Sequence, residues 1–184
     1  MNLPNFLSLL RILAVPAFIW LVSNGELVAG WILFAAAGVT DALDGYLAKR
    51  LDQVTELGSY LDPLADKLLL VSGFVVLTVE GLMPLWLTLA MVTREILILV
   101  GALVVQLLTG HLRMEPLKVS KVNTVAQIVT VWLVLFSAAH GGVLVWAIGP
   151  LLWFTLITTV VSGLMYVFEW SRRVTEETGG FPPA

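Results

Sequence analysis

Four aspartates that interrupt apolar stretches are the residues in this sequence whose types and spacing could do chemistry. Asp41 and Asp44 are three positions apart, and Asp62 and Asp66 are four apart, so each pair shares one face of a helix. A turn at roughly Lys49–Leu57 would let the two helices return antiparallel and bring the pairs together. An ionised side chain near a bilayer centre costs roughly 2.5–3.5 kcal/mol, so four of them imply a counter-charge and a use.

A cluster of this kind predicts an all-oxygen metal site. The chain has no cysteine, and neither of its two histidines lies near the aspartates in sequence. Carboxylate oxygens suit Mg²⁺, Mn²⁺ or Ca²⁺ and disfavour zinc and copper. The alternative is a structural salt-bridge network with Lys67 and Arg94. We favour the metal site because these two cations are too few to neutralise four aspartates and Glu95.

Small residues mark the same region, at Gly45, Ala48 and Gly58. A glycine inside a helix costs roughly 1 kcal/mol relative to alanine, so it is expected where another group approaches the backbone closely. This face could therefore admit a flat group such as a nucleotide. Small residues are equally common where membrane helices pack on each other, and both interpretations stay open.

The composition indicates a membrane protein. Of the 184 residues, 59% are hydrophobic and only 12% are charged, whereas soluble domains carry about 25% charged residues. The net charge of −3 and the lack of a basic run give no indication of nucleic-acid binding. The absence of cysteine excludes disulfides, thiolate metal sites and cysteine catalysis.

Six segments approach the roughly 20 apolar residues that cross a bilayer core about 30 Å thick. The first lacks a positively charged start and a convincing cleavage site, so we interpret it as a retained helix. We predict a single all-α transmembrane domain over residues 1–184 without internal repeats. The predicted spans are Leu7–Ser23, Leu27–Leu47, Leu61–Val79, Pro84–Leu108, Val119–Ala138 and Val143–Trp170.

The basic residues predict the orientation. With both termini in the cytoplasm, the outer loops contain no lysine or arginine, which is a strong positive-inside pattern. The predicted inner loops and tail contain Lys49, Arg50, Arg113, Lys118, Lys121, Arg172 and Arg173. The predicted outer helix ends contain Trp20, Trp31, Trp86 and Trp146, where indoles prefer to lie.

The segment from Asp41 to Asp66 resembles the signature of the CDP-alcohol phosphatidyltransferases. It reads Asp41-Ala-Leu-Asp-Gly-Tyr-Leu-Ala-Lys49, an eight-residue spacer, and Gly58-Ser-Tyr-Leu-Asp-Pro-Leu-Ala-Asp66. The family pattern is DxxDGxxAR, an eight-residue spacer, and GxxxDxxxD. The resemblance covers nearly the whole chain, because the opening through Arg11 is similar to the glycerophospholipid branch. Lys49 stands where the family usually has arginine, which leaves open whether Lys49 or Arg50 has that role.

This resemblance implies a membrane enzyme that transfers a phosphatidyl group from CDP-diacylglycerol to an alcohol and releases CMP. It implies two divalent ions, Mg²⁺ or Mn²⁺, held by Asp41, Asp44, Asp62 and Asp66, with Asp66 also the general base. The residues implied to bind the CDP group are Asp41, Asp44, Gly45, Ala48, Lys49, Gly58 and Asp62. It further implies a homodimer in the inner (cytoplasmic) membrane, with the active site facing the cytoplasm.

The acceptor alcohol is predicted from cations outside the metal site. Arg94, Lys118 and Lys121 could form a basic pocket, although the two lysines also fit the positive-inside pattern and Glu95 or Asp66 could pair with Arg94. Lys67 could be a structural counter-ion, and an arginine at position 11 more often anchors its helix than binds a ligand.

Two acceptors compete, phosphatidylglycerol as in cardiolipin synthases and glycerol 3-phosphate as in phosphatidylglycerophosphate synthases. We favour phosphatidylglycerol, because Asn123 and Leu103 stand where the second branch commonly has cations. A cation transporter is the alternative from another class, since intramembrane aspartates often bind permeating ions. It is disfavoured because the acids are confined to two adjacent helices near one membrane face. A catalytically inactive scaffold is disfavoured because all four aspartates are present.

Overall fold

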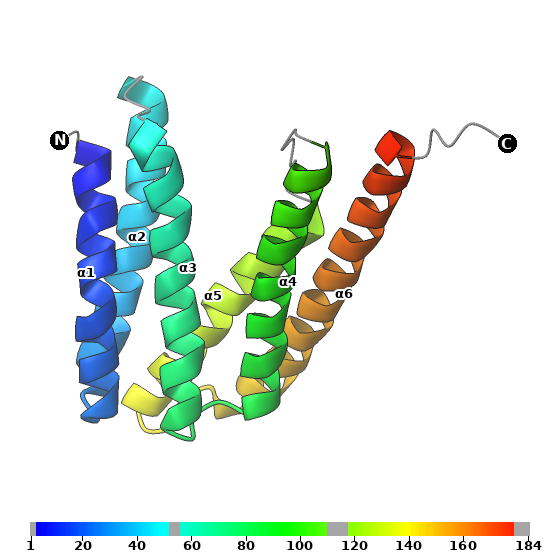
Figure 1. The fold of residues 1–184 in the computed structure, drawn as a ribbon. Helices are drawn as coiled ribbons and strands as arrows, with labels where there is room; N and C mark the ends of the chain where they lie inside the picture. The colour runs from blue at the N-terminus through cyan, green and yellow to red at the C-terminus, as the bar shows by residue number, and fades with distance from the viewer. Residues whose placement is uncertain (1–2, 52–55, 110–117, 179–184) are drawn as a thin grey trace, which may run out of the picture.

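The structure, a computed structural model, describes the backbone of residues 3–51, 56–109 and 118–178 and the side chains of residues 8–41, 64–107 and 118–172. These ranges are helical apart from short turns, as the sequence predicts (Figure 1). The helices are α1 (Leu3–Ser23), α2 (Leu27–Leu51), α3 (Glu56–Val79), α4 (Leu85–Thr109), α5 (Lys118–Ala139) and α6 (Val145–Thr178).

The connection between α2 and α3 is shorter than the expected turn at Lys49–Leu57. Helix α2 continues to Leu51 and α3 begins at Glu56, so Lys49 lies in a helix. The physical reason is that residues 47–51 are leucine, alanine, lysine and arginine, all strong helix formers, with no breaker among them. The expectation that Lys49 lies in a turn was therefore wrong.

Glycines in a left-handed conformation follow three of the helices. Gly25, Gly81 and Gly141 have φ values of +79°, +72° and +70°, a left-handed conformation that residues with a Cβ rarely adopt. The glycines thus fix where α1, α3 and α5 stop and where the chain reverses.

The helices form two groups joined by α5. Helix α1 packs on α2 and α3, α4 packs on α6, and α5 packs on both α6 and α2. In Figure 1 the groups approach each other where α3 ends and α4 begins, and they separate toward the end where α1 begins and α6 ends. The core includes Phe18 and Phe34, whose ring centroids are 5.7 Å apart, with Leu87 and Val131 also fully buried. This arrangement places the aspartate-bearing ends of α2 and α3 at the separated end.

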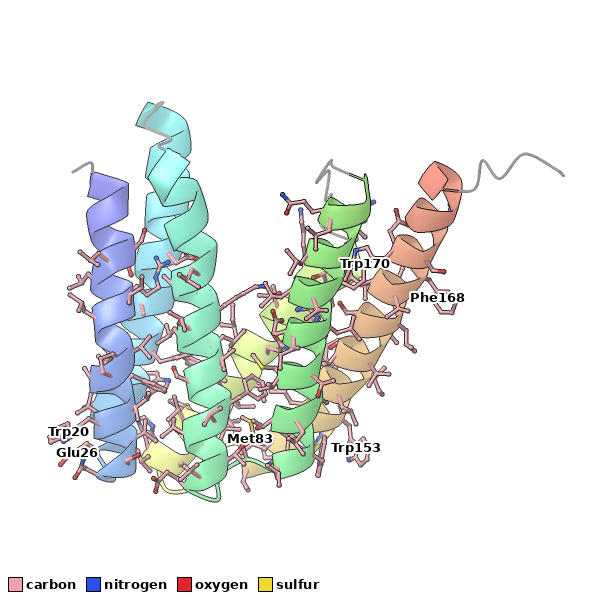
Figure 2. All side chains as sticks on the ribbon, viewed as in Figure 1. Trp20, Glu26, Met83, Trp153, Phe168 and Trp170 are labelled. Atoms are coloured by element: carbon pink, nitrogen blue, oxygen red, sulfur yellow. The ribbon has the colours of Figure 1, made fainter. Side chains whose placement is uncertain are left out.

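The described surface is largely apolar, and the interior contains many polar side chains beside its apolar core. Large hydrophobic side chains such as Trp153 and Phe168 are exposed, and Figure 2 shows both pointing away from the bundle. The fully or almost fully buried polar side chains include Ser8, Asn123, Gln127, Thr130, Thr155, Thr159 and Ser162. Interhelical contacts between small polar residues, with apolar side chains facing outward, are typical of membrane helices.

Three segments among the described residues are long and apolar enough to cross a membrane, at Leu85–Leu107, Lys118–Ala139 and Val145–Arg172. Two shorter apolar helical segments, Ser8–Ser23 and Leu27–Asp41, belong to α1 and α2. The structure thus supports an all-helical membrane protein with three clear candidate spans. The prediction of six spans with both termini in the cytoplasm stays a prediction.

Candidate functional site

Three helices bring Asp41 and Asp66 together around the guanidinium of Arg11. Nη1 of Arg11, on α1, lies 2.9 Å from Oδ1 of Asp41 on α2 and 2.5 Å from Oδ1 of Asp66 on α3. Because α1 packs on both other helices, its side chain can contact carboxylates that are 25 positions apart in the chain. The convergence expected from the sequence is therefore present for these two aspartates.

The three side chains differ in their exposure to solvent. The Arg11 side chain is 2% exposed, whereas those of Asp41 and Asp66 are 41% and 43% exposed. The carboxylates are thus held by a buried cation and remain accessible to a ligand. Sequence analysis missed this role of Arg11. The available signal was a lone arginine within the apolar α1 segment, where an unpaired cation is costly.

Asp44 and Asp62 occupy helical positions beside this pair, although their side chains lie outside those that the structure describes. Asp44 is three residues after Asp41 in α2, and Asp62 is four residues before Asp66 in α3, so each adjoins its partner on one helix face. Among the described side chains, one guanidinium faces two carboxylates, and the excess negative charge favours binding of cations. At Gly45, Ala48, Lys49 and Gly58, which are expected near the CDP group, the structure describes the backbone alone.

Lys67 and Arg94 do not neutralise the described aspartates, because both pair with Glu95. Nζ of Lys67 lies 3.2 Å from Oε2 of Glu95, and Nη1 of Arg94 donates a hydrogen bond to Oε1 of the same carboxylate. Among the described side chains, the salt-bridge network considered as an alternative thus forms around Glu95. The negative charge of Asp41 and Asp66 is balanced only in part by Arg11.

The two described aspartates fit an oxygen-ligated divalent ion, because they come from different helices and converge within hydrogen-bond distance of one nitrogen. No group of three or more histidine, cysteine, aspartate or glutamate side chains gathers among those that the structure describes. The two described aspartates therefore supply only part of the predicted ligand set, and Asp44 and Asp62 would supply the rest.

The three residues predicted to bind the acceptor lie in different surroundings. Arg94 is 6% exposed, its Nη2 donates to Ser162 Oγ at 3.0 Å, and its guanidinium carbon lies 5.9 Å from the centre of the Tyr166 ring. Lys118 and Lys121 are exposed at the start of α5. The structure thus separates a buried, paired arginine from two accessible lysines.

Lys121 borders a shallow groove of about 390 Å³ between α5 and α6. Apart from this lysine, the lining is apolar and consists of Val122, Val125, Ala126, Val129, Leu151 and Phe154. A cation at the edge of an apolar groove is a combination that suits the phosphate and acyl chain of a lipid better than a small polar solute.

The two positions that distinguished the acceptor branches in the sequence have no contact with Asp41 or Asp66, the two aspartates whose side chains are described. Asn123 is fully buried between α5 and α6, where its Oδ1 accepts hydrogen bonds from Thr158 and Thr159 at 3.0 and 2.8 Å. Leu103 is 56% exposed on α4. Any effect of these positions on the acceptor would be exerted through helix packing or the surface.

The class of protein follows from the similarity of this chain to a known family. Residues 1–165 match the CDP-alcohol phosphatidyltransferase family. The chain belongs to this family, and the match includes all four aspartates.

Its relatives carry two different names. A cardiolipin synthase (CMP-forming) of Streptomyces coelicolor is 44% identical over 54% of this chain and 49% of its own length. A probable cardiolipin synthase (CMP-forming) of Drosophila melanogaster is 32% identical over 92% of this chain and 58% of its own length. The CDP-diacylglycerol–glycerol-3-phosphate 3-phosphatidyltransferase of Bacillus subtilis is 34% identical over 90% of this chain and 93% of its own length. The matches to the first two thus span about half of those proteins.

Proposed function

We propose that this protein is a membrane CDP-alcohol phosphatidyltransferase of glycerophospholipid biosynthesis. It transfers the phosphatidyl group of CDP-diacylglycerol to a glycerol-type acceptor and releases CMP. The observation that carries this proposal is the convergence of Asp41 and Asp66 from two helices, within the segment that has the family signature. Family membership also favours this activity over cation transport.

In this proposal the four aspartates Asp41, Asp44, Asp62 and Asp66 hold two divalent ions, Mg²⁺ or Mn²⁺. When bound, these ions supply the positive charge that neutralises the pyrophosphate and the departing CMP. The ribose and cytosine lie against Gly45, Ala48 and Gly58, where the lack of large side chains leaves room beside the helices. Lys49 is placed near the phosphates by the family signature and presents a single ammonium rather than the bidentate fork of arginine.

Asp66 has the additional role of general base. It accepts the proton of the acceptor hydroxyl as that oxygen attacks phosphorus, and the bond from phosphorus to the CMP oxygen breaks. Its partial exposure is compatible with contact to a bound alcohol, and its contact with Arg11 orients the carboxylate. Asp41 has the same arginine partner but is assigned to metal binding only, following the family signature.

We favour phosphatidylglycerol as the acceptor, which makes the reaction that of a cardiolipin synthase. The apolar groove beside Lys121 supports a lipid acceptor, and the pairing of Arg94 with Glu95 removes one cation from a site that would bind a dianion. Lys118 and Lys121 are the exposed cations that this proposal places near the acceptor phosphate. Glycerol 3-phosphate is the second candidate, favoured by the relative from Bacillus subtilis that matches over most of both chains.

For the whole chain we propose one domain over residues 1–184, with six spans in the inner (cytoplasmic) membrane. Both termini and the active site face the cytoplasm, and the protein is a homodimer. The position of α1's beginning and α6's end at one end of the bundle is compatible with this topology. The positive-inside distribution of lysine and arginine indicates which end of the bundle faces the cytoplasm.

Release of CMP by the purified, detergent-solubilised protein tests the proposal and identifies the acceptor. The assay contains CDP-diacylglycerol and Mg²⁺ with either phosphatidylglycerol or glycerol 3-phosphate. We expect release with phosphatidylglycerol. Release with glycerol 3-phosphate alone would assign the second activity, and no release with any alcohol tested would contradict the proposed function.

A further inference from the structure

The buried guanidinium of Arg11 occupies the point on which two candidate metal ligands converge. A single nitrogen, Nη1, lies 2.9 Å from Asp41 and 2.5 Å from Asp66, so one cation contacts both carboxylates at once. The arginine side chain is almost fully buried, whereas both carboxylates are partly exposed. Arg11 therefore contacts the pair from within the protein and leaves the outer side of each carboxylate accessible.

We propose that Arg11 is the internal counter-cation of the aspartate site and competes with divalent ions for Asp41 and Asp66. This inference rests on the proposed function, because it assumes that these aspartates bind metal. Without an ion, the guanidinium offsets the repulsion between two carboxylates on different helices. A divalent ion bound to the same carboxylates brings a second positive charge close to the guanidinium of Arg11. The ion and the guanidinium repel each other strongly, because the surroundings are less polar than water.

The competition gives Arg11 opposite effects on two states of the protein. It stabilises the ion-free chain, because removing one partner of a buried ion pair leaves charge uncompensated. It weakens metal binding, because part of the carboxylate charge is already neutralised. An arginine with a purely structural role would instead stabilise the ion-free and ion-bound chains equally.

The test uses the full chain in detergent with Mn²⁺ alone, without nucleotide or acceptor. Thermal unfolding is recorded in EDTA and in Mn²⁺, and the Kd for Mn²⁺ is measured by electron paramagnetic resonance. For Arg11→Gln we expect a Tm several degrees below wild type in EDTA, a Mn²⁺-induced rise in Tm at least twice that of wild type, and a Kd lower by tenfold or more. Equal Mn²⁺-induced rises, or weaker binding by the variant, would overturn the inference.

Arg94→Gln is the matched control, because it also removes a buried arginine that pairs with a carboxylate. It should lower the Tm in EDTA but show the same Mn²⁺-induced rise as wild type. If Arg11→Gln does not fold even with Mn²⁺, Arg11→Met decides. Methionine also removes the positive charge and is buried more readily than an amide, so its Mn²⁺-induced rise should exceed that of wild type, and an equal rise would refute the inference.

The same experiment separates failure of this inference from failure of the proposed function. Wild-type protein that releases CMP and binds Mn²⁺, with an unchanged Kd in Arg11→Gln, would refute only the role of Arg11. Wild-type protein that neither binds Mn²⁺ nor releases CMP would refute the metal-dependent transferase, and the inference with it.

Discussion

At the scale of single residues, the pairing of the described charges explains which carboxylates remain available. Lys67 and Arg94 both pair with Glu95, and Arg11 is the cation that contacts Asp41 and Asp66 among the described side chains. The sequence placed the aspartates on common helix faces because helical spacing is local. It could not pair Arg11 with carboxylates on two other helices, because that contact depends on how α1 packs. It also left Glu95 or Asp66 open as the partner of Arg94, and the structure gives Glu95.

Asp66→Asn should separate catalysis from binding. Asparagine keeps the size of the side chain but cannot accept the acceptor proton, so we expect kcat to fall by about 10²–10⁴-fold. Binding of CDP-diacylglycerol, measured by calorimetry in detergent, should fall much less than it does in Asp41→Asn. Equal loss of binding in the two variants would contradict the assignment of Asp66 as the base.

Lys121→Ala should affect the acceptor and not the donor. Lys121 is exposed at the edge of the apolar groove, and an exposed ion pair is weak, so we expect the acceptor KM to rise about two- to fivefold. The KM for CDP-diacylglycerol is the internal control and should stay constant. An unchanged acceptor KM would remove Lys121 from the acceptor site.

At the scale of helices, the observed ends agree with the predicted spans within a few residues at most positions, because apolar length and glycine breakers are local signals. The main difference is the predicted α2–α3 turn, because α2 continues to Leu51 through a run of strong helix formers and α3 already begins at Glu56. Packing partners were not predictable in the same way. No sequence pattern indicates that Gly101 packs against Trp170. In the structure, however, a Cβ built on Gly101 would lie 1.9 Å from the Trp170 ring.

Gly101→Ala should therefore destabilise the contact between α4 and α6. The added methyl group collides with the Trp170 ring, and overpacking of this kind typically costs about 1–3 kcal/mol. Gly38→Ala is the matched control, since a Cβ there meets no atom within 4 Å and alanine favours the helix. Thermal unfolding in detergent should show a lower Tm only for Gly101→Ala, and an equal Tm in both variants would be inconsistent with this packing.

Asn123→Leu should weaken the contact between α5 and α6. The variant removes the oxygen that accepts hydrogen bonds from Thr158 and Thr159, and interhelical hydrogen bonds in membranes contribute on average about 0.6 kcal/mol. We expect a lower Tm with an unchanged preference between the two acceptors. Thr124→Val, on an exposed position of the same helix, should leave the Tm near that of wild type. A changed acceptor preference with wild-type stability would show that Asn123 contributes to acceptor selection directly.

At the scale of the whole molecule, the apolar surface and the polar side chains buried between helices support a membrane protein, while the direction of insertion rests on the distribution of basic residues. The absence of cysteine allows single cysteines to be placed without background labelling. Position 80 of Glu80→Cys lies just beyond the end of α3, and position 118 of Lys118→Cys begins α5, so the two positions are expected on opposite membrane faces. A thiol reagent that does not cross the inner membrane should label position 80 in spheroplasts and position 118 only after lysis, and the reverse pattern would invert the topology.

In the proposed mechanism, the aspartate site needs divalent metal for phosphatidyl transfer. The measurement that tests it is the Mg²⁺ dependence of CMP release from CDP-diacylglycerol in wild type, Asp41→Asn and Glu80→Gln. Glu80 is an exposed carboxylate just beyond the opposite end of α3 and provides the control. We predict Mg²⁺-dependent release by wild type and Glu80→Gln, and release lowered by at least about 10²-fold in Asp41→Asn. Release by wild type that persists in EDTA, or full activity in Asp41→Asn, would contradict the metal-dependent mechanism.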